Sequence, residues 1–103
     1  MNIEKLSFEE AKQLLDRESD AMLLDVREEA EYITGHPDGA ELFTLADIDA
    51  DSAAYLIPSY DTPLLVYCRS GIRSREAVIR LHELGYTRVY DLGSMVGWPY
   101  SNF

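Results

Sequence analysis

The chain has little cysteine and little positive charge. Its 103 residues include one cysteine, Cys68, and nine Lys and Arg residues against nineteen Asp and Glu, for a formal net charge of −10. A single cysteine excludes an internal disulfide, a zinc cluster built on several cysteines, and a second thiol able to resolve an oxidised Cys68. The acidic balance argues against a general nucleic-acid surface or one for anionic membranes. Any anion that binds must therefore be held by local positive charge.

Long apolar runs are also missing. No run approaches the ~20 residues of a membrane-spanning helix, and the opening segment, MNIEKLSFEE, lacks the basic and then apolar pattern of a secretion signal. We therefore expect a cytoplasmic protein with neither a membrane nor a nucleic-acid partner. The length suits one domain with a substantial core, so we expect residues 1–103 to form a single domain.

Short apolar runs alternate with helical patterns along the chain, which is typical of an α/β domain with a mostly parallel sheet. Ser7 and Glu10 form a capping-box pattern at the start of the first predicted helix, and Gly85 ends the last. The predicted helices are SFEEAKQLLDRE, REEAEYI, DADSAAYLI and a segment starting at Arg73. The predicted strands are AMLLDV, GAELF, LLVYC and RVYDL, and GSMVGWPY is expected to form a closing turn or short helix.

The segment CRSGIR, residues 68–73, joins the most apolar predicted strand to the last predicted helix. Gly71 frees one backbone angle, so successive N–H groups can point at the Cys68 sulfur. The helix N-terminus adds partial positive charge, and three arginines lie close in sequence. We therefore expect Cys68 to be a thiolate nucleophile whose neighbours can also hold an anionic substrate. These arginines are Arg69, Arg73 and Arg75.

A packing role for this cysteine is the alternative. A lone cysteine at the end of a buried strand is, in general, more often a small packed residue than a catalyst. The combination here favours function: the cysteine ends a strand, a glycine and an arginine lie in the loop, and a helix follows directly. Ligand sites of open α/β sheets gather at this end of the strands.

Three segments together resemble the single-domain rhodaneses, a family of sulfurtransferases. CRSGIR is similar to their active-site pattern Cys-Arg-Ser-Gly-x-Arg. LLDVREEAEYITGHPDGAELF resembles the N-terminal signature of the family, and LGSMVGW resembles its C-terminal Gly-Gly-x-x-x-Trp signature. The resemblance covers Met22 to Trp98 in the expected order. It implies a rhodanese-like α/β fold, with about five mostly parallel strands and helices on both faces.

The resemblance also implies roles for individual residues. Cys68 would take a sulfane sulfur from a small anionic donor such as thiosulfate, become a persulfide, and pass the sulfur to cyanide, an external thiol or a partner protein's cysteine. No metal and no cofactor would be needed. The substrate-binding loop would comprise Arg69, Ser70, Gly71, Ile72 and Arg73, with Arg73 the residue expected to touch substrate. Supporting roles would belong to Asp25, Arg27 and Ser74, whereas His36 is expected to form a structural hydrogen bond and Trp98 to pack.

The chain departs from the family pattern at two positions. Pro37 stands where the family has a branched apolar residue, which could stiffen or shift the turn leading to Gly39. Ser94 replaces the second glycine of the C-terminal signature and could narrow or polarise the entrance to the site. The departure at Ser94 bears on the choice of acceptor more than on the class of reaction.

Two other functions stay open at the level of sequence. Cysteine phosphatases, including arsenate reductases, also place a thiolate in an arginine-closed loop, but five residues separate their cysteine and arginine, whereas four separate Cys68 and Arg73. The smaller loop suits a bound sulfane sulfur better than a tetrahedral phosphate, whose oxygens need further donors. The second alternative is a rhodanese-like module that binds a partner or senses redox state without catalysis.

Overall fold

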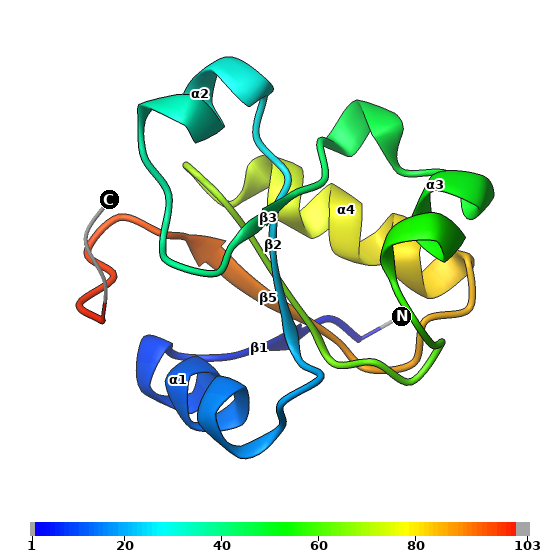
Figure 1. Cartoon of the computed structure of the whole chain (residues 1–103), viewed down its shortest axis with the longest axis horizontal. Helices are drawn as coiled ribbons and strands as arrows, with labels where there is room; N and C mark the ends of the chain where they lie inside the picture. Colours follow the sequence, from blue (N-terminus) through cyan, green and yellow to red (C-terminus); the bar gives the residue numbers. More distant parts are fainter. Residues whose placement is uncertain (1, 101–103) are drawn as a thin grey trace.

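Five parallel strands form the central sheet of the computed structural model, which describes residues 2–100 (Figure 1). Their order across the sheet is β1-β5-β4-β2-β3. The α/β class and the parallel sheet expected from the sequence are confirmed. In chain order the strands are β1 (Glu4–Lys5), β2 (Met22–Asp25), β3 (Glu41–Leu42), β4 (Leu64–Cys68) and β5 (Val89–Ser94).

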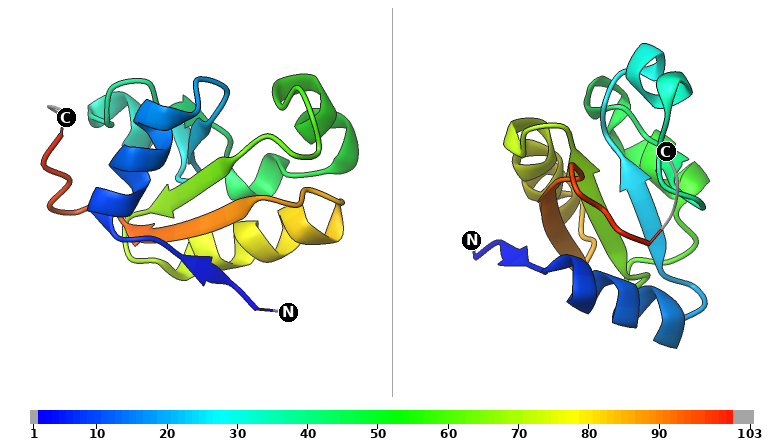
Figure 2. Two further views of the ribbon diagram at one scale, coloured as in Figure 1. Left: turned by 90° about the horizontal axis from the view of Figure 1, so that it is seen from below. Right: turned by 90° about the vertical axis from the view of Figure 1, so that its left-hand side faces the viewer.

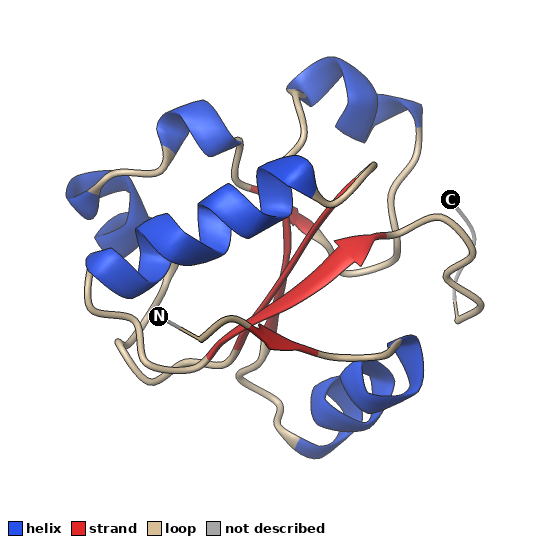
Figure 3. Cartoon of the chain, turned by 180° about the vertical axis from the view of Figure 1, so that it is seen from behind, coloured by secondary structure: helices blue, strands red, loops and turns tan. Residues whose placement is uncertain are grey.

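Helices cover both faces of the sheet, because parallel strands need long crossover connections (Figures 2 and 3). One face carries α1, and the other carries α3 and α4. A single 3₁₀ turn precedes α3. The helices are α1 (Phe8–Arg17), α2 (Glu29–Thr34), α3 (Ala50–Leu56) and α4 (Ile72–Glu83), and the 3₁₀ turn η1 spans Leu45–Asp47.

The central strand β4 is buried along its whole length. Successive side chains of a strand point to opposite faces, and here each face has its own apolar cluster. Leu65 and Tyr67 pack on the α1 side, whereas Val66 and Cys68 pack on the α4 side. A strand covered on both faces must be apolar throughout, which explains the uninterrupted run LLVYC.

Helix ends follow the capping signals in the sequence. Ser7 and Glu10 form the predicted capping box, since the Glu10 N–H donates to Ser7 Oγ at 3.1 Å and the Ser7 N–H donates to Glu10 Oε1 at 2.9 Å. At the end of α4, Gly85 adopts a φ of +106° and its N–H donates to the His82 carbonyl. The Tyr86 N–H donates to the Leu81 carbonyl, which completes a Schellman motif.

The structure differs from the sequence-based expectation in several details, and the predicted strand GAELF is reduced to Glu41–Leu42. The short exposed strand β1 was not expected, because two residues give no apolar pattern. The last strand extends beyond RVYDL to Ser94, and only the residues after it form the closing turn. The final helix begins at Ile72, one residue earlier than expected. Among the described residues, no helix has the length and apolarity that crossing a membrane would require.

Candidate active site

The only cysteine of the chain lies at the carboxyl end of the central strand β4. Cys68 has no exposed surface, and its neighbours across the sheet are β2 on one side and β5 on the other. Three residues separate it from the first residue of α4. The strand-to-helix loop expected from CRSGIR is therefore present, with the sulfur beside the helix N-terminus.

Two backbone N–H groups donate to the Cys68 sulfur. The Gly71 N–H lies 2.9 Å from Sγ, and the Ser74 N–H lies 3.4 Å from it. Gly71 has a φ of +95°, a conformation that glycine adopts without strain. The Ser74 hydroxyl donates to the Gly71 carbonyl at 3.1 Å and so fixes the loop against the first turn of α4. Oriented N–H groups of this kind stabilise negative charge on the sulfur.

A cavity of about 230 Å³ lies beside Cys68. Two arginines and the turn that follows β5 complete its walls, so this part of the site comes from segments distant in sequence. The lining residues are Arg27, Cys68, Arg69, Met95, Val96 and Gly97. The sequence analysis predicted that Arg69 lies in the substrate-binding loop, but it did not predict that Arg27 or the turn 95–97 would line the cavity beside Cys68. Cys68 belongs to the lining although none of its surface is exposed to solvent.

Arg27 is held in place by a buried carboxylate. Its Nε and Nη2 donate to the two oxygens of Asp25 at 2.8 to 3.1 Å, and Nη2 also donates to the Gly35 carbonyl at 2.8 Å. The Tyr67 hydroxyl also donates to the Asp25 carboxylate. Hydrogen bonding to Asp25 raises the pKa of Arg27, and burial, followed by the Asp25 hydrogen bond, raises the pKa of Tyr67. Asp25 thus orients Arg27, which reaches the cavity wall, and a supporting role for these two residues in catalysis stays a prediction.

Arg73 forms a bidentate salt bridge with Glu31 of α2. Its two terminal nitrogens donate to the carboxylate oxygens of Glu31 at 2.6 and 3.0 Å. This pair lowers the pKa of Glu31 to about 2, with the hydrogen bond from Arg73 as the largest cause. Arg27 and Arg69, rather than Arg73, are the arginines that line the cavity. Contact between Arg73 and a substrate therefore stays a prediction, and its observed contact locks the loop to α2.

Three further residues of the loop and of the first turns of α4 face solvent. Ser70 and Arg75 are exposed, and Ile72 keeps 76% of its surface exposed. Arg75 does not belong to the cavity lining described above. His36 has the structural role expected for it, since its Nδ1 lies 2.8 Å from the Tyr32 carbonyl and its ring stacks on the Tyr32 ring.

The two departures from the family pattern have distinct structural places. Pro37 is buried and begins a turn in which the Ala40 N–H donates to its carbonyl at 3.1 Å, with Gly39 at a φ of +80°. Ser94 ends β5, and its hydroxyl accepts from the Val96 N–H at 3.2 Å. Ser94 therefore acts on the cavity through the turn that it anchors, not as part of the wall.

Comparison with known proteins identifies the family. The model of the rhodanese-like domain matches residues 7–99. The thiosulfate sulfurtransferase GlpE of Pseudoalteromonas translucida is 30% identical over 100 residues, covering 95% of this chain and 90% of the relative. The probable adenylyltransferase/sulfurtransferase MoeZ of Mycobacterium tuberculosis is 31% identical over 86% of this chain, which spans only 23% of that larger protein.

Solved structures agree on the fold. The rhodanese-like domain of an Anabaena protein superimposes with a TM-score of 0.80 at 25% identity, covering 95% of this chain and 74% of that chain. A rhodanese from E. coli, solved with anions, gives a TM-score of 0.68 at 30% identity over 77% of this chain and 94% of its own. With its family match, its five-stranded parallel sheet and a cysteine at the end of the central strand, the chain belongs to the rhodanese-like domain family.

Proposed function

We propose that this protein is a sulfurtransferase that moves a sulfane sulfur from a small anionic donor to a thiophilic acceptor through a persulfide on Cys68. One observation carries the proposal: the Cys68 sulfur accepts hydrogen bonds from two backbone N–H groups, and Cys68 lies beside a cavity whose walls include two arginines. The similarity to GlpE, named a thiosulfate sulfurtransferase, supports thiosulfate as the donor.

In the loading step, the Cys68 thiolate attacks the outer sulfur of thiosulfate. A new sulfur–sulfur bond forms to Sγ, and the original sulfur–sulfur bond of the donor breaks, with its electron pair leaving on sulfite. No outside oxidant or reductant is needed, because the transferred sulfur arrives in the oxidation state that a persulfide requires. The Gly71 and Ser74 N–H groups, which face Sγ, would stabilise the charge in the resulting persulfide.

The two arginines of the cavity suit an anionic donor. A guanidinium group offers several N–H donors in one plane, which matches the oxygens of a sulfonate end. Arg27 is oriented by Asp25 and the Gly35 carbonyl, so its remaining donor capacity has a fixed direction. Arg69 is exposed and follows the nucleophile directly. The cavity of about 230 Å³ is several times the ~30 Å³ share of one liquid water, so it has room for a small anion.

Discharge requires a nucleophile from outside the chain. The sequence contains no second cysteine, so an internal thiol cannot attack the persulfide. Cyanide, a small thiol or a partner protein's cysteine would attack the outer sulfur, and the electron pair of the breaking bond would return to Sγ as thiolate. Cyanide would leave as thiocyanate.

The complete burial of Cys68 is the observation that favours a non-catalytic module instead. Steady-state production of thiocyanate from thiosulfate and cyanide separates the two functions. The parent protein should produce thiocyanate, and Cys68→Ser should not, with circular dichroism confirming that the variant is folded. Equal activity in both proteins would overturn the persulfide mechanism, and inactivity of the parent with every sulfane donor would favour the binding module. Hydrolysis of phenyl phosphate esters by the parent would favour the phosphatase alternative.

A further inference from the structure

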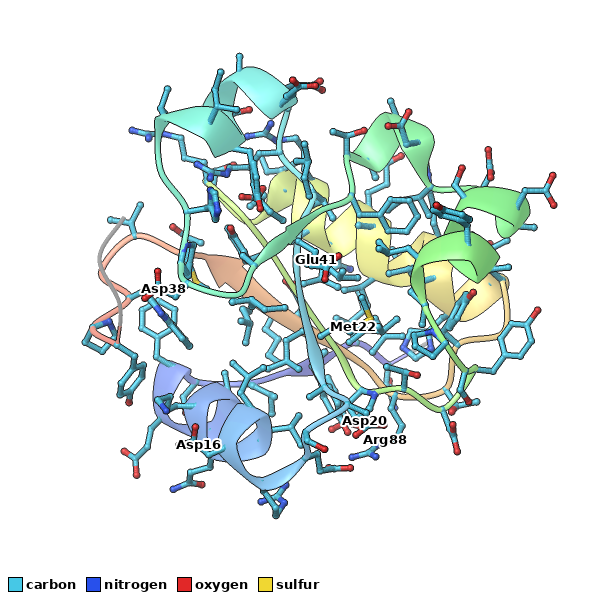
Figure 4. All side chains as sticks on the ribbon, viewed as in Figure 1. Asp16, Asp20, Met22, Asp38, Glu41 and Arg88 are labelled. Carbon is cyan, nitrogen blue, oxygen red and sulfur yellow. The ribbon has the colours of Figure 1, made fainter. Side chains whose placement is uncertain are left out.

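The negative charge of the protein is concentrated in one part of the chain. Residues 28–68 contain nine of the nineteen acidic residues and no Lys or Arg. The remainder of the chain is therefore close to neutral. Residues 28–68 include α2, β3, η1 and α3, which lie together at the β3 edge of the sheet, whereas α1 lies on the opposite side (Figure 1). In Figure 4, Glu41, which belongs to this part of the chain, lies above Arg88 and Asp20 in the view.

A groove of about 430 Å³ lies within this acidic region. Its lining combines apolar side chains from the end of β3 and from α3 with two carboxylates, and it shares no residue with the lining of the Cys68 cavity. The lining residues are Leu42, Phe43, Asp47, Asp51, Ser52, Tyr55 and Leu56.

Three features of the groove suit a peptide segment. Tyr55 has 95% of its surface exposed, so its ring is available to pack against a bound segment. Asp47 and Asp51 are exposed, and neither forms an ion pair within residues 2–100. The guanidinium of Arg80 binds Glu76 at 3.1 Å and the Leu45 carbonyl at 3.0 Å instead of these two carboxylates.

The groove also meets an open edge of the sheet. β3 is the outermost strand and pairs only with β2. The Phe43 N–H donates to the Asp25 carbonyl at 2.8 Å. Because alternate residues of a strand direct their backbone groups to opposite sides, those of Leu42 point toward the open edge. An extended segment could therefore contact both the strand edge and the groove.

We propose that this groove binds an extended segment of a partner protein that carries an apolar side chain flanked by Lys or Arg residues. The apolar side chain packs against Tyr55, Leu42 and Leu56, and the cations meet Asp47 and Asp51. The concentrated negative charge of residues 28–68 steers such a basic segment to this side of the molecule. The groove is a separate site from the Cys68 cavity, since the two have no lining residue in common.

The test is a titration of the full chain with a defined probe, followed by amide NMR shifts. The probe is an acetylated and amidated peptide, Gly-Lys-Val-Arg-Leu-Lys-Gly, and its control has Glu in place of each Lys and Arg. The basic peptide should shift the amides of Leu42, Phe43 and Tyr55, and the acidic peptide should not. Tyr55→Ala should weaken binding by about fivefold or more, because an exposed aromatic anchor dominates small interfaces.

A matched pair of charge variants completes the test. Asp51→Asn should weaken binding of the basic peptide by about threefold or more, whereas Asp20→Asn, an exposed acid outside the acidic region, should change it by less than about 1.5-fold. Absence of binding, or shifts spread over all acidic residues with no effect of Tyr55→Ala, would overturn the proposal. So would concentration-dependent shifts of the groove amides without peptide, since the occupant would then be a second copy of the chain.

Discussion

Gly71 joins the conformation of the loop to the chemistry of the sulfur, so Gly71→Ala is an informative perturbation. Its φ of +95° disfavours any residue with a Cβ, at a cost of about 1–2 kcal/mol. A Cβ at this position would meet Gly93 Cα at 3.6 Å, which is an ordinary contact. The cost therefore comes from the backbone and not from a clash. We expect the strain to relax by rotation of the peptide whose nitrogen lies 2.9 Å from Sγ.

Gly85 provides the matched control for this substitution. Its φ is +106°, and a Cβ there would lie 3.5 Å from the ring of Tyr60, so Gly85→Ala carries the same kind of strain. Gly85 ends α4 at the far end from Cys68. Both variants should lose about 1–2 kcal/mol of unfolding free energy, or about 4–16 °C in Tm for a domain of this size.

Only the variant at Gly71 should also impair sulfur transfer. Loss of a donor to the reacting atom costs about tenfold or more in rate. Urea unfolding gives the stability of each variant, and the rate of thiosulfate-dependent labelling of the protein gives the chemistry. Parent-like loading by Gly71→Ala, or equally impaired loading by Gly85→Ala, would refute the role assigned to the Gly71 N–H.

Other contacts of the site give further predictions. Glu31→Gln should remove about 1 kcal/mol of stability at neutral pH, since the partly exposed pair with Arg73 is screened by solvent, and urea unfolding measures the loss. Because the pKa of Glu31 is lowered from 4.5 to about 2 in the folded protein, the ionised carboxylate stabilises the fold above about pH 4.5. This contribution is lost as pH falls toward about 2, so the unfolding free energies of the parent and of Glu31→Gln should converge there. Tyr67→Phe should cost about 1–2 kcal/mol in the same assay, because Asp25 loses a buried donor; unchanged stability would contradict this. Arg73→Ala should raise the thiosulfate concentration needed for half-maximal rate, with partial rescue by Arg73→Lys, and parent-like saturation of both would show that the arginine has no substrate role. Persulfide discharge to cyanide should slow as salt rises, because salt screens the arginines that line the cavity, and faster discharge would show that the overall negative charge governs approach.

The sequence predicted the elements whose signals are local. LLVYC is the observed strand β4 to the residue, and the capping box of Ser7 and the glycine stop at Gly85 fall where the pattern placed them. These features depend on neighbours within a few residues. The loop was also predictable, because a glycine between a strand and a helix allows N–H groups to face the preceding side chain.

The walls of the site could not be predicted in the same way. The pair of Arg73 with Glu31 joins residues 42 positions apart, so the direction of Arg73 depends on where α2 packs. Arg27 follows β2, which lies beside β4, and this adjacency places both strand ends at the same edge of the sheet. The Asp-Val-Arg segment, combined with that strand order, is the signal that could have placed Arg27 in the cavity. The turn at Met95 closes the site because its N–H donates to the Cys68 carbonyl, a contact that no local pattern reveals.

Intact-protein mass spectrometry after incubation with thiosulfate tests the central claim most directly. The parent chain should gain about 32 Da, the mass of one sulfur atom on the Cys68 thiol, and Cys68→Ser should gain nothing. After removal of excess donor, the adduct should persist in buffer, because the chain has no second thiol, and should disappear on addition of cyanide. An unmodified parent after incubation with thiosulfate and other sulfane donors, or the same adduct on Cys68→Ser, would contradict the account.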